Sequence, residues 1–218
     1  FVAGRVMNGS YPMPPRSYLL KNNGGVFTDV TEAVNKDLLS PGMITSAIWT
    51  DVNNDGRKDL MMAGEWMPLR VFINDGETLS EKSSAFGLDA TCGWWNCLME
   101  VDLNNDGYPE ILAGNSGENS FFKPTPEHPV YITAKDFDKN ESVDPIISYY
   151  NPVEGDRFIV HNRLVLIDQI PAMKKRFETF TGYATTPFAK TFTPGELKDA
   201  FESGVQLLSS VVLMNQNG

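Results

Sequence analysis

The chain has 218 residues, with 28 acidic against 18 basic side chains, and its formal net charge at pH 7 is −10. This acidity argues against a nucleic-acid-binding protein, which needs a basic face. Hydrophobic residues make up 41% of the sequence, which suits a globular protein with a core, and no apolar run is long enough to span a membrane.

The first predicted element is a short apolar strand, residues 1–4, which ends in Ala-Gly. The same ending closes two later apolar runs, residues 61–64 and 111–114. The second predicted element is a hairpin, because Asn-Gly and Asp-Gly between apolar runs tolerate the positive φ that tight turns require. Three such hairpins are predicted, at residues 18–27, 69–79 and 211–218.

Three nine-residue loops lie among these elements and carry side-chain oxygens at the same odd-numbered positions. In each loop, positions 1, 3, 5 and 9 are Asp, Asn or Glu, and position 7 offers a backbone carbonyl. The candidate ligands are Asp51, Asn53, Asp55, Arg57 and Asp59 in the first loop, Asp102, Asn104, Asp106, Tyr108 and Glu110 in the second, and Asp136, Asp138, Asn140, Ser142 and Asp144 in the third.

Each loop supplies about six hard oxygen ligands, which is the number that Ca²⁺ prefers in proteins. Position 6 is glycine in the first two loops, which allows a sharp turn, whereas the third loop has Glu141 there. We therefore expect Ca²⁺ in the first two loops, and the third is a further candidate whose occupancy depends on Glu141. Asp-Asn-Gly clusters also form ordinary turns without a metal, and this alternative stays open.

The loops differ from EF-hands, which need a closing carboxylate at position 12 and flanking helices. Position 12 is instead Met62, Ala113 or Ile147, and a short apolar run of strand length follows each loop. Each loop therefore closes at position 9 and leads into a buried strand.

A strand, a loop, a second strand and a hairpin thus repeat along the chain. Short antiparallel strands at such spacing are typical of propeller blades. We predict a mainly β fold, a partial β-propeller of about three to four blades, which is fewer than most closed rings have. The blades would occupy residues 1–152, with a return strand at 205–218. Because the repeat begins and ends within a blade, we expect the chain to be part of a larger protein.

Residues 153–204 interrupt the repeat and are predicted to form an inserted α-helical hairpin. Apolar residues recur at helical spacing over residues 167–180, and Pro171 should kink or split that helix. Residues 193–196, Thr-Pro-Gly-Glu, read as the N-cap, the N1 proline and the capping-box glutamate of a second helix. The apolar face of this second helix would extend to Gly204.

The Asp-x-Asn-x-Asp-Gly-x-x-Asp loops, the Ala-Gly strand ends and the Asn-x-Gly hairpins resemble the FG-GAP/VCBS repeats of integrin-α-like β-propellers. Residues 114–120, 136–138 and 163–177 look like segments of the large surface VCBS/ASPIC-type proteins of Bacteroidetes. This resemblance implies a calcium-braced propeller that is secreted or exported to the cell surface. The departures from the repeat pattern are Glu110 for Asp at position 9 and Glu141 for Gly at position 6.

No catalytic constellation is evident in the sequence. His128 and His161 are the only histidines, and neither has the spacing of a metal site or a triad. The clustered carboxylates, which a glycosidase would need, lie in the calcium loops, where a metal would keep them deprotonated. Cys92 and Cys97 either close a small disulfide or stay free, and the sequence favours neither.

The leading hypothesis is a non-enzymatic, calcium-stabilised extracellular binding or adhesion module with a protein or glycan ligand at a propeller face. Aromatic residues near strand ends would stack on sugar rings or form a protein hot spot if exposed, and would form core between blades if buried. These residues are Trp66, Trp94, Trp95, Phe121, Phe122, Tyr149 and Tyr150. The alternatives are a propeller scaffold of a carbohydrate-active lyase or hydrolase with catalytic residues outside this chain, and a structural spacer.

Overall fold

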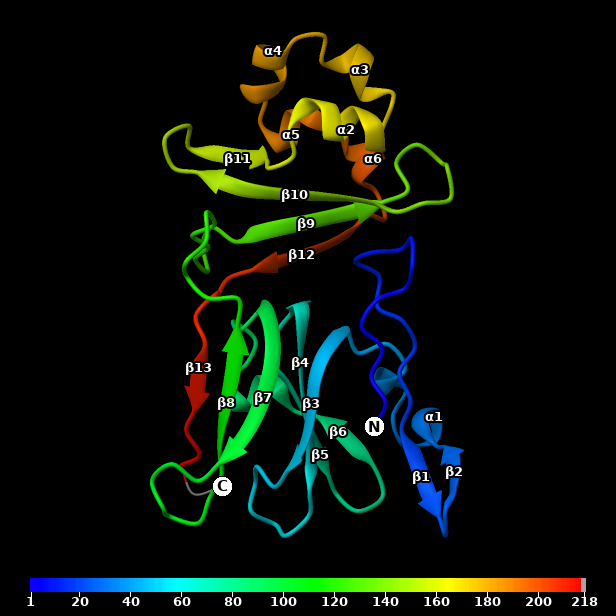
Figure 1. The fold of residues 1–218 in the computed structure, drawn as a ribbon, viewed down its shortest axis with the longest axis vertical. Coiled ribbons are helices and arrows are strands. Elements are labelled where there is room, and N and C mark those ends of the chain that lie inside the picture. Colours follow the sequence, from blue (N-terminus) through cyan, green and yellow to red (C-terminus); the bar gives the residue numbers. More distant parts are fainter. Residues whose placement is uncertain (217–218) are drawn as a thin grey trace.

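The computed structural model describes residues 1–216, and over this range the protein is mainly β with short helices (Figure 1). The strands form a two-stranded, a four-stranded and a seven-stranded sheet, in which the strand pairs are antiparallel. Within the described range the sheets do not close into a barrel. The predicted fold class, a partial β-propeller of blade-like units, is confirmed. None of the described helices is long and apolar enough to cross a membrane.

In the N-terminal unit, residues 1–38, the short strand predicted for residues 1–4 is reduced to an isolated bridge between Val2 and Tyr18. A hairpin follows, as predicted, with Gly24 and Gly25 at its turn. All four residues of its second strand are exposed. The elements are β1 (Leu20–Asn23), β2 (Val26–Asp29), α1 (Thr31–Val34) and η1 (Lys36–Leu38).

The first blade is a four-stranded meander. It consists of β3 (Met43–Thr50), β4 (Asp59–Met67), β5 (Arg70–Asn74) and β6 (Leu79–Glu81), and η2 (Ser83–Phe86) follows it. β4 packs on both faces, because Met61 and Ala63 contribute to the core shared with the second blade while Leu60 and Met62 contribute to the core shared with the N-terminal unit. This two-sided burial explains why the strand is a continuous apolar run.

The β1–β2 and β5–β6 hairpins repeat each other in register. Phe27 lies opposite Asn22 in the first hairpin, and Leu79 lies opposite Asn74 at the same position of the second. The hydroxyl that follows each hairpin, Thr31 or Ser83, accepts a hydrogen bond from a backbone amide of the same blade-like unit, at 2.7 and 3.0 Å respectively. The N-terminal unit therefore has the last strands of a blade.

The second blade consists of β7 (Gly93–Val101), β8 (Glu110–Asn115) and β13 (Val211–Leu213). β7 also pairs with the end of β4, which joins the two blades into one sheet. β13 is the terminal strand of that sheet, and no fourth strand follows it in the described residues. Of the hairpin predicted for residues 211–218, only the first strand is seen, because Asn217 and Gly218 lie outside the described residues.

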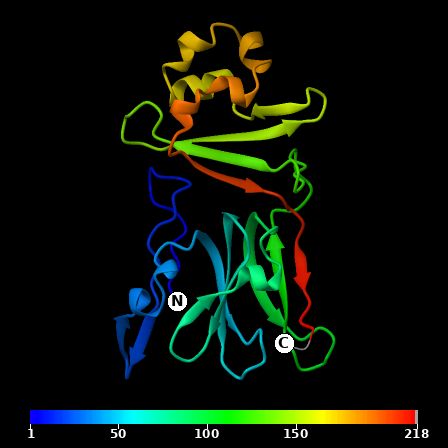
Figure 2. The same cartoon turned by 180° about the vertical axis from the view of Figure 1, so that it is seen from behind.

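Between β8 and β13 the chain leaves the second blade, builds an inserted sheet with a helical cap, and returns (Figures 1 and 2). The inserted sheet, in the order β11-β10-β9-β12, consists of β9 (Val130–Lys135), β10 (Asp144–Asn151), β11 (Asp156–Ile159) and β12 (Phe201–Val205). The helical cap connects β11 to β12 and consists of α2 (Arg163–Gln169), α3 (Met173–Arg176), α4 (Phe180–Ala184), α5 (Phe188–Thr191) and α6 (Pro194–Leu197).

The helices of the cap differ from the predicted α-hairpin in residues 153–204. Pro171 separates α2 from α3, as predicted, and the capping box of Thr193 and Glu196 is present. The second helix, however, ends at Leu197 and does not extend to Gly204, so that part of the prediction is wrong. Residues of its expected apolar face instead belong to β12 and pair with β9, because a strand partner outweighs weak helical periodicity.

The Ala-Gly strand ends share a steric cause. A Cβ atom on Gly64 would lie 2.2 Å from the carbonyl oxygen of Met43, and one on Gly114 would lie 2.7 Å from Sγ of Cys97. On Gly4 it would lie 2.5 Å from a proline side chain. These separations are far below van der Waals contact, so glycine is what allows the neighbouring segments to approach at each repeat.

Candidate metal-binding loops

The three predicted loops occupy the same place in three β units. The first joins β3 to β4, the second joins β7 to β8, and the third joins β9 to β10. Each loop thus connects the first two strands of its unit, and the fifteen candidate ligand residues lie in or directly beside these connections. The third loop belongs to the inserted sheet, whereas the first two loops belong to the first and second blades.

The backbone has the same conformation in all three loops at the two positions that turn most sharply. At position 4, Asn54, Asn105 and Lys139 have φ values of 56°, 58° and 64°. At position 6, Gly56 and Gly107 have φ values of 83° and 88°, and Glu141 has 69°. The third loop therefore adopts the left-handed turn without glycine, at a cost in backbone strain.

The position 1 carboxylate organises each loop through its neighbours' amides. The amide of residue 56 donates to Oδ2 of Asp51 at 2.9 Å, and the equivalent bonds to Asp102 and Asp136 measure 3.1 and 3.0 Å. The amide at position 7 likewise donates to the oxygen of the residue at position 5, at 2.8 Å in every loop. These bonds aim the side-chain oxygens of positions 1 and 5 at the backbone amides of the turn.

The position 9 carboxylate anchors each loop to the strand below it. Asp59 and Glu110 are fully buried, and Asp144 is 4% exposed. Each accepts a hydrogen bond from the amide at position 2, at 3.0, 2.7 and 3.0 Å respectively. Asp59 also accepts one from the amide of Asn74 at 2.8 Å, which ties the first loop to β5.

Burial makes two of the position 9 carboxylates, Asp59 and Asp144, harder to ionise. Burial raises the pKa of Asp59 above its usual value, and the charges of Asp55 and Asp51 raise it further against the effect of its two amide donors. The pKa of Asp144 is raised for the same reasons, by burial first and then by Asp138 and Asp136. At neutral pH a nearby cation would offset the cost of ionising both groups.

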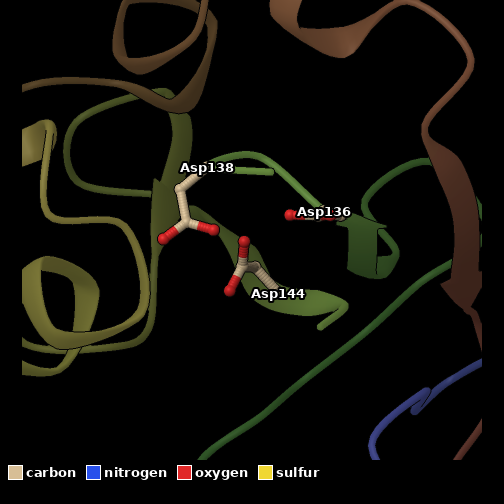
Figure 3. A group of neighbouring side chains, drawn as sticks. All are labelled: Asp136, Asp138 and Asp144. Atoms are coloured by element: carbon tan, nitrogen blue, oxygen red, sulfur yellow. The ribbon is translucent and has the colours of Figure 1, made fainter. Parts of the chain in front are cut away.

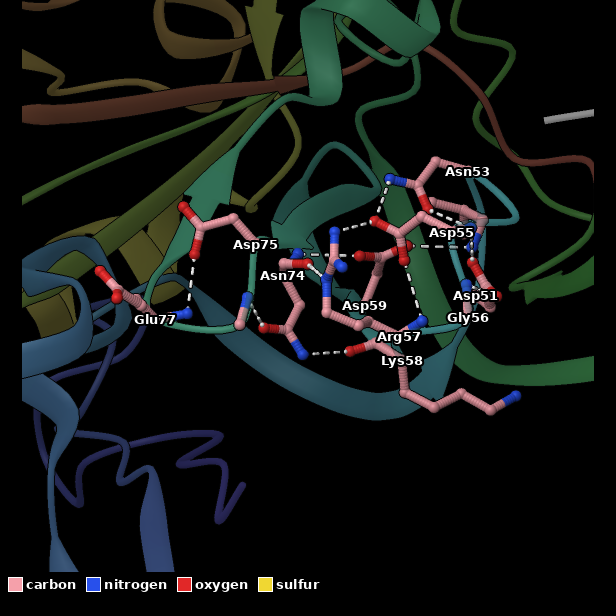
Figure 4. Close-up of polar contacts among 12 residues, drawn as sticks. Asp51, Asn53, Asp55, Gly56, Arg57, Lys58, Asp59, Asn74, Asp75 and Glu77 are labelled. Atoms are coloured by element: carbon pink, nitrogen blue, oxygen red, sulfur yellow. Dashed lines mark hydrogen bonds and ion pairs between the residues drawn. The ribbon is translucent and has the colours of Figure 1, made fainter.

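Three carboxylates of the third loop lie close together (Figure 3). One oxygen from each of Asp136, Asp138 and Asp144 lies within 4.8 Å of the others. In the first loop, Arg57 competes for the carboxylate of Asp55, because its Nη2 lies 2.5 Å from Oδ2 (Figure 4). The loop with the poorest sequence match therefore has the most closely grouped acidic oxygens in the described chain.

Asn74 is a structural member of the first loop that the nine-residue pattern does not contain. Its side-chain amide donates to the carbonyl of Lys58 at 2.9 Å, and its own carbonyl accepts from Nε of Arg57 at 2.8 Å (Figure 4). It is the last residue of β5 and lies outside the loop, so only its place before the Asp-Gly hairpin turn marks it in the sequence.

The donor sets fit Ca²⁺, a hard cation that takes oxygen ligands from carboxylates, amide side chains and backbone carbonyls. In the second loop Oε1 of Glu110 is buried and has no hydrogen-bond partner among the described residues, while its Oε2 is held by an amide. A buried carboxylate oxygen without a donor is costly unless a cation compensates it. Asp102, Asn104 and Asp106 would complete the same site.

Residues 51–113 match the family model of the FG-GAP-like repeat. The matched FG-GAP-like repeat starts at position 1 of the first loop and ends in β8, so it spans the first two loops and the strands between them. No curated protein and no solved structure matches the chain. The finer resemblance to Bacteroidetes surface proteins is not confirmed and stays a prediction.

The aromatic residues are partly core and partly surface. Five of them meet edge to face at the junction of the inserted sheet with the two blades, with ring centroids 5.1 to 6.4 Å apart. These are Trp66, Trp94, Phe121, Phe122 and Tyr149. Trp66 is 5% exposed and Phe121 is 71% exposed, so the row of rings runs from core to surface. Trp95 is fully buried, and Tyr150 stacks on His128.

The two cysteines and His161 are the remaining candidate groups from the sequence. Cys92 is buried and Cys97 is exposed, and both are free, so the structure favours the free-thiol alternative. Burial raises the pKa of the Cys92 thiol. His161 is half-buried, which lowers its pKa, and its carbonyl accepts a hydrogen bond from the hydroxyl of Tyr183 at 2.6 Å.

Proposed function

We propose that this protein is a non-enzymatic binding or adhesion module of the cell exterior whose blades and inserted sheet are braced by Ca²⁺. The observation that carries the proposal is the construction that the three loops share, each with a buried position 9 carboxylate that accepts a hydrogen bond from the amide at position 2. An ionised acid is costly to bury, and a cation bound by the loop would compensate its charge.

Calcium would act structurally here. Each loop brings several acidic groups together, and their mutual repulsion opposes the turn when no cation is present. A bound ion would neutralise this repulsion and would hold the two strands on either side of the loop in register. The groups that would hold it are the side-chain oxygens at positions 1, 3, 5 and 9 of each loop, with the backbone carbonyl at position 7.

The proposed location follows from the repeat and from affinity. FG-GAP-like repeats are typical of extracellular and surface proteins. Calcium sites of extracellular modules are typically weak, and weak sites fill where calcium is millimolar, which is outside the cell. The partner would be a protein or a glycan, and the exposed end of the aromatic row at Phe121 supports a contact surface there.

The test is a thermal melt of chelator-stripped protein into which Ca²⁺ is titrated, paired with calorimetric counting of bound ions. We expect the melting temperature to rise and to saturate near the two or three ions per chain that the loops provide. Mg²⁺ at equal concentration should act less, because it dehydrates reluctantly and prefers stricter geometry. An unchanged melting curve would show that the loops are plain turns.

Two isosteric variants make the test site-specific. Glu110→Gln keeps an acceptor for the Leu103 amide but loses the charge, so it should remove one ion from the count. Glu77→Gln changes an exposed residue outside the loops and should leave the count intact. For the binding role, calcium-dependent retention on glycan-coated or protein-coated beads, with no product released from polysaccharide, separates a binding module from an enzyme.

A further inference from the structure

The helical cap is basic on a molecule that is otherwise acidic. Residues 163–197, which hold α2 to α6, contain five basic and three acidic side chains and so have a net charge of +2, whereas the whole chain has −10. The residues outside the cap therefore carry −12. The cap forms one end of the long axis of the molecule, and the blades with the N-terminal unit form the other (Figures 1 and 2). Charge is thus segregated along this axis.

The arginines and the lysines of the cap have different surroundings. Arg163 donates from Nε to a backbone carbonyl at 2.7 Å, and Arg176 pairs with Glu196 at 2.8 Å, so both arginines hold the helices together. Lys174 and Lys175 of α3 are exposed, and their ammonium groups have no hydrogen bond or ion pair with another described residue. The two lysines therefore offer positive charge that the fold itself does not use.

Exposed apolar side chains lie on the outer surface of the same cap. Leu164 is 55% exposed, Val165 is 42% exposed and Phe180 is 61% exposed. The guanidinium of Arg163 lies 5.1 Å from the ring centroid of Phe180, which places the first turn of α4 beside the first turn of α2. Leu166, on the other side of α2, belongs to the core that the cap shares with β10. The exposed apolar side chains therefore face away from the inserted sheet.

We propose that the outer surface of the helical cap binds a lipid surface with anionic headgroups, with Lys174 and Lys175 at the headgroups and Leu164 and Phe180 inserted among them. Basic and apolar side chains together are the composition of helices that lie in a membrane interface. An anionic surface would attract the cap and repel the acidic blades, so the molecule would meet it with the cap first. A fluid lipid surface also accommodates apolar side chains on a protruding end, which have no groove to enter.

The charges of the cap set the expected strength of binding. A lysine near an anionic leaflet strengthens binding about fivefold, so the double variant Lys174→Gln with Lys175→Gln should bind about 25-fold more weakly. Phe180→Ser should weaken binding about tenfold, because an apolar ring no longer leaves water. Asp168 is exposed on α2 between Leu164 and Val165 and opposes the contact, so Asp168→Asn should strengthen binding about fivefold.

The experiment is co-sedimentation with vesicles of phosphatidylcholine and phosphatidylglycerol, compared with vesicles of phosphatidylcholine alone, at low and at high salt. The wild type should bind only the anionic vesicles, and high salt should weaken the binding. Two matched controls should bind like the wild type. Lys21→Gln with Lys82→Gln removes the same charge from exposed lysines of the N-terminal unit and the first blade, and Phe27→Ser removes a 63% exposed ring from the far end of the molecule.

Several results would overturn the proposal. They are equal binding to both kinds of vesicle, no binding at low salt, and unchanged binding by the double lysine variant. Calcium bridges between the blades and the lipid would give binding that ignores the cap variants, which is the same contradiction. Lysine-dependent self-association in sedimentation velocity without vesicle binding would assign the cap to an acidic protein surface instead, and would also overturn it.

The Asp168→Asn variant keeps the test decisive if a loss variant fails to fold, because it predicts a gain. Circular dichroism of each variant shows whether the fold is kept. The calcium-dependent melting curves contain no lipid and depend on the loops, so they test the proposed function separately from the lipid contact.

Discussion

The strained turn of the third loop gives the sharpest test of the loop geometry. Glu141 has φ of 69°, where Gly56 and Gly107 stand in the other loops. A left-handed conformation costs an L-residue about 1–2 kcal/mol, and glycine loses about 0.5–1 kcal/mol more entropy than other residues on folding. Glu141→Gly should therefore stabilise the protein by about 0.5–1 kcal/mol, because the relief exceeds the entropy loss.

The matched control reverses the change in a loop of the same shape. A Cβ atom on Gly107 would meet nothing within 4 Å, so Gly107→Glu probes the backbone cost without a clash. It should destabilise the protein by about 1–2 kcal/mol. Both variants should be measured by urea unfolding and thermal melting in chelator, so that calcium binding does not enter the comparison.

In melting temperature the expected changes are a rise of about 1–4 °C for Glu141→Gly and a fall of about 2–8 °C for Gly107→Glu, from the usual scaling for a chain of this size. A Glu141→Gly variant that is less stable than the wild type would refute the strain argument. Equal stability of Gly107→Glu and the wild type would refute the shared backbone geometry of the loops.

Further predictions concern the anchors, the helical cap and the strand ends. The folded state raises the pKa of Asp144, so protonation of this group stabilises the folded protein at low pH, and this stabilisation is lost as pH rises through the raised pKa. Asp144→Asn cannot ionise. In calcium-free urea titrations its free energy of unfolding should therefore increase relative to that of the wild type from pH 4 to pH 7. Arg176 lowers the pKa of Glu196 to about 2, so the stability that Glu196 contributes is present above its unfolded pKa and is lost on acidification toward pH 2. Unfolding followed by circular dichroism should show the wild type to be more stable than Glu196→Gln at neutral pH and no more stable near pH 2. Gly64→Ala should lower the free energy of unfolding by about 3 kcal/mol, because a backbone oxygen blocks the new Cβ atom. Gly114→Ala should lower it by about 1 kcal/mol, because the Cys97 side chain that the new Cβ atom would meet can rotate. Equal urea midpoints for the two variants would contradict this difference.

The sequence was most informative where a short pattern fixes a backbone. Nine residues with oxygens on alternate positions fold on themselves through local amide bonds, so the loops and the strands that follow them were predicted correctly. The hairpins at residues 18–27 and 69–79 were also predicted correctly, because Asn-Gly and Asp-Gly turns are a local signal. Even Glu141, which weakened the third pattern, follows the backbone of the other loops, because surrounding hydrogen bonds determine the turn.

The sequence was least informative where distant segments compete. Residues Phe201–Val205 have helical periodicity, and only the presence of β9 makes them a strand. Nor does any local signal show that β8 and β13, separated by the inserted sheet, pair with each other. The contact of Asn74 with the first loop is of the same kind, because it depends on how β5 packs beside β4.

The point where the inserted sheet leaves the second blade has a consequence for how such chains diversify. The amide of Asn115 donates to the hydroxyl of Ser210 at 3.0 Å, so the exit and the return of the excursion lie side by side. Topologically, a short turn could replace everything between them. Packing forbids a clean excision, because Met43, Trp66 and Cys92 of the blades share a core with Val130 and Val205. Variants of this architecture must therefore keep an apolar underside on whatever replaces the excursion.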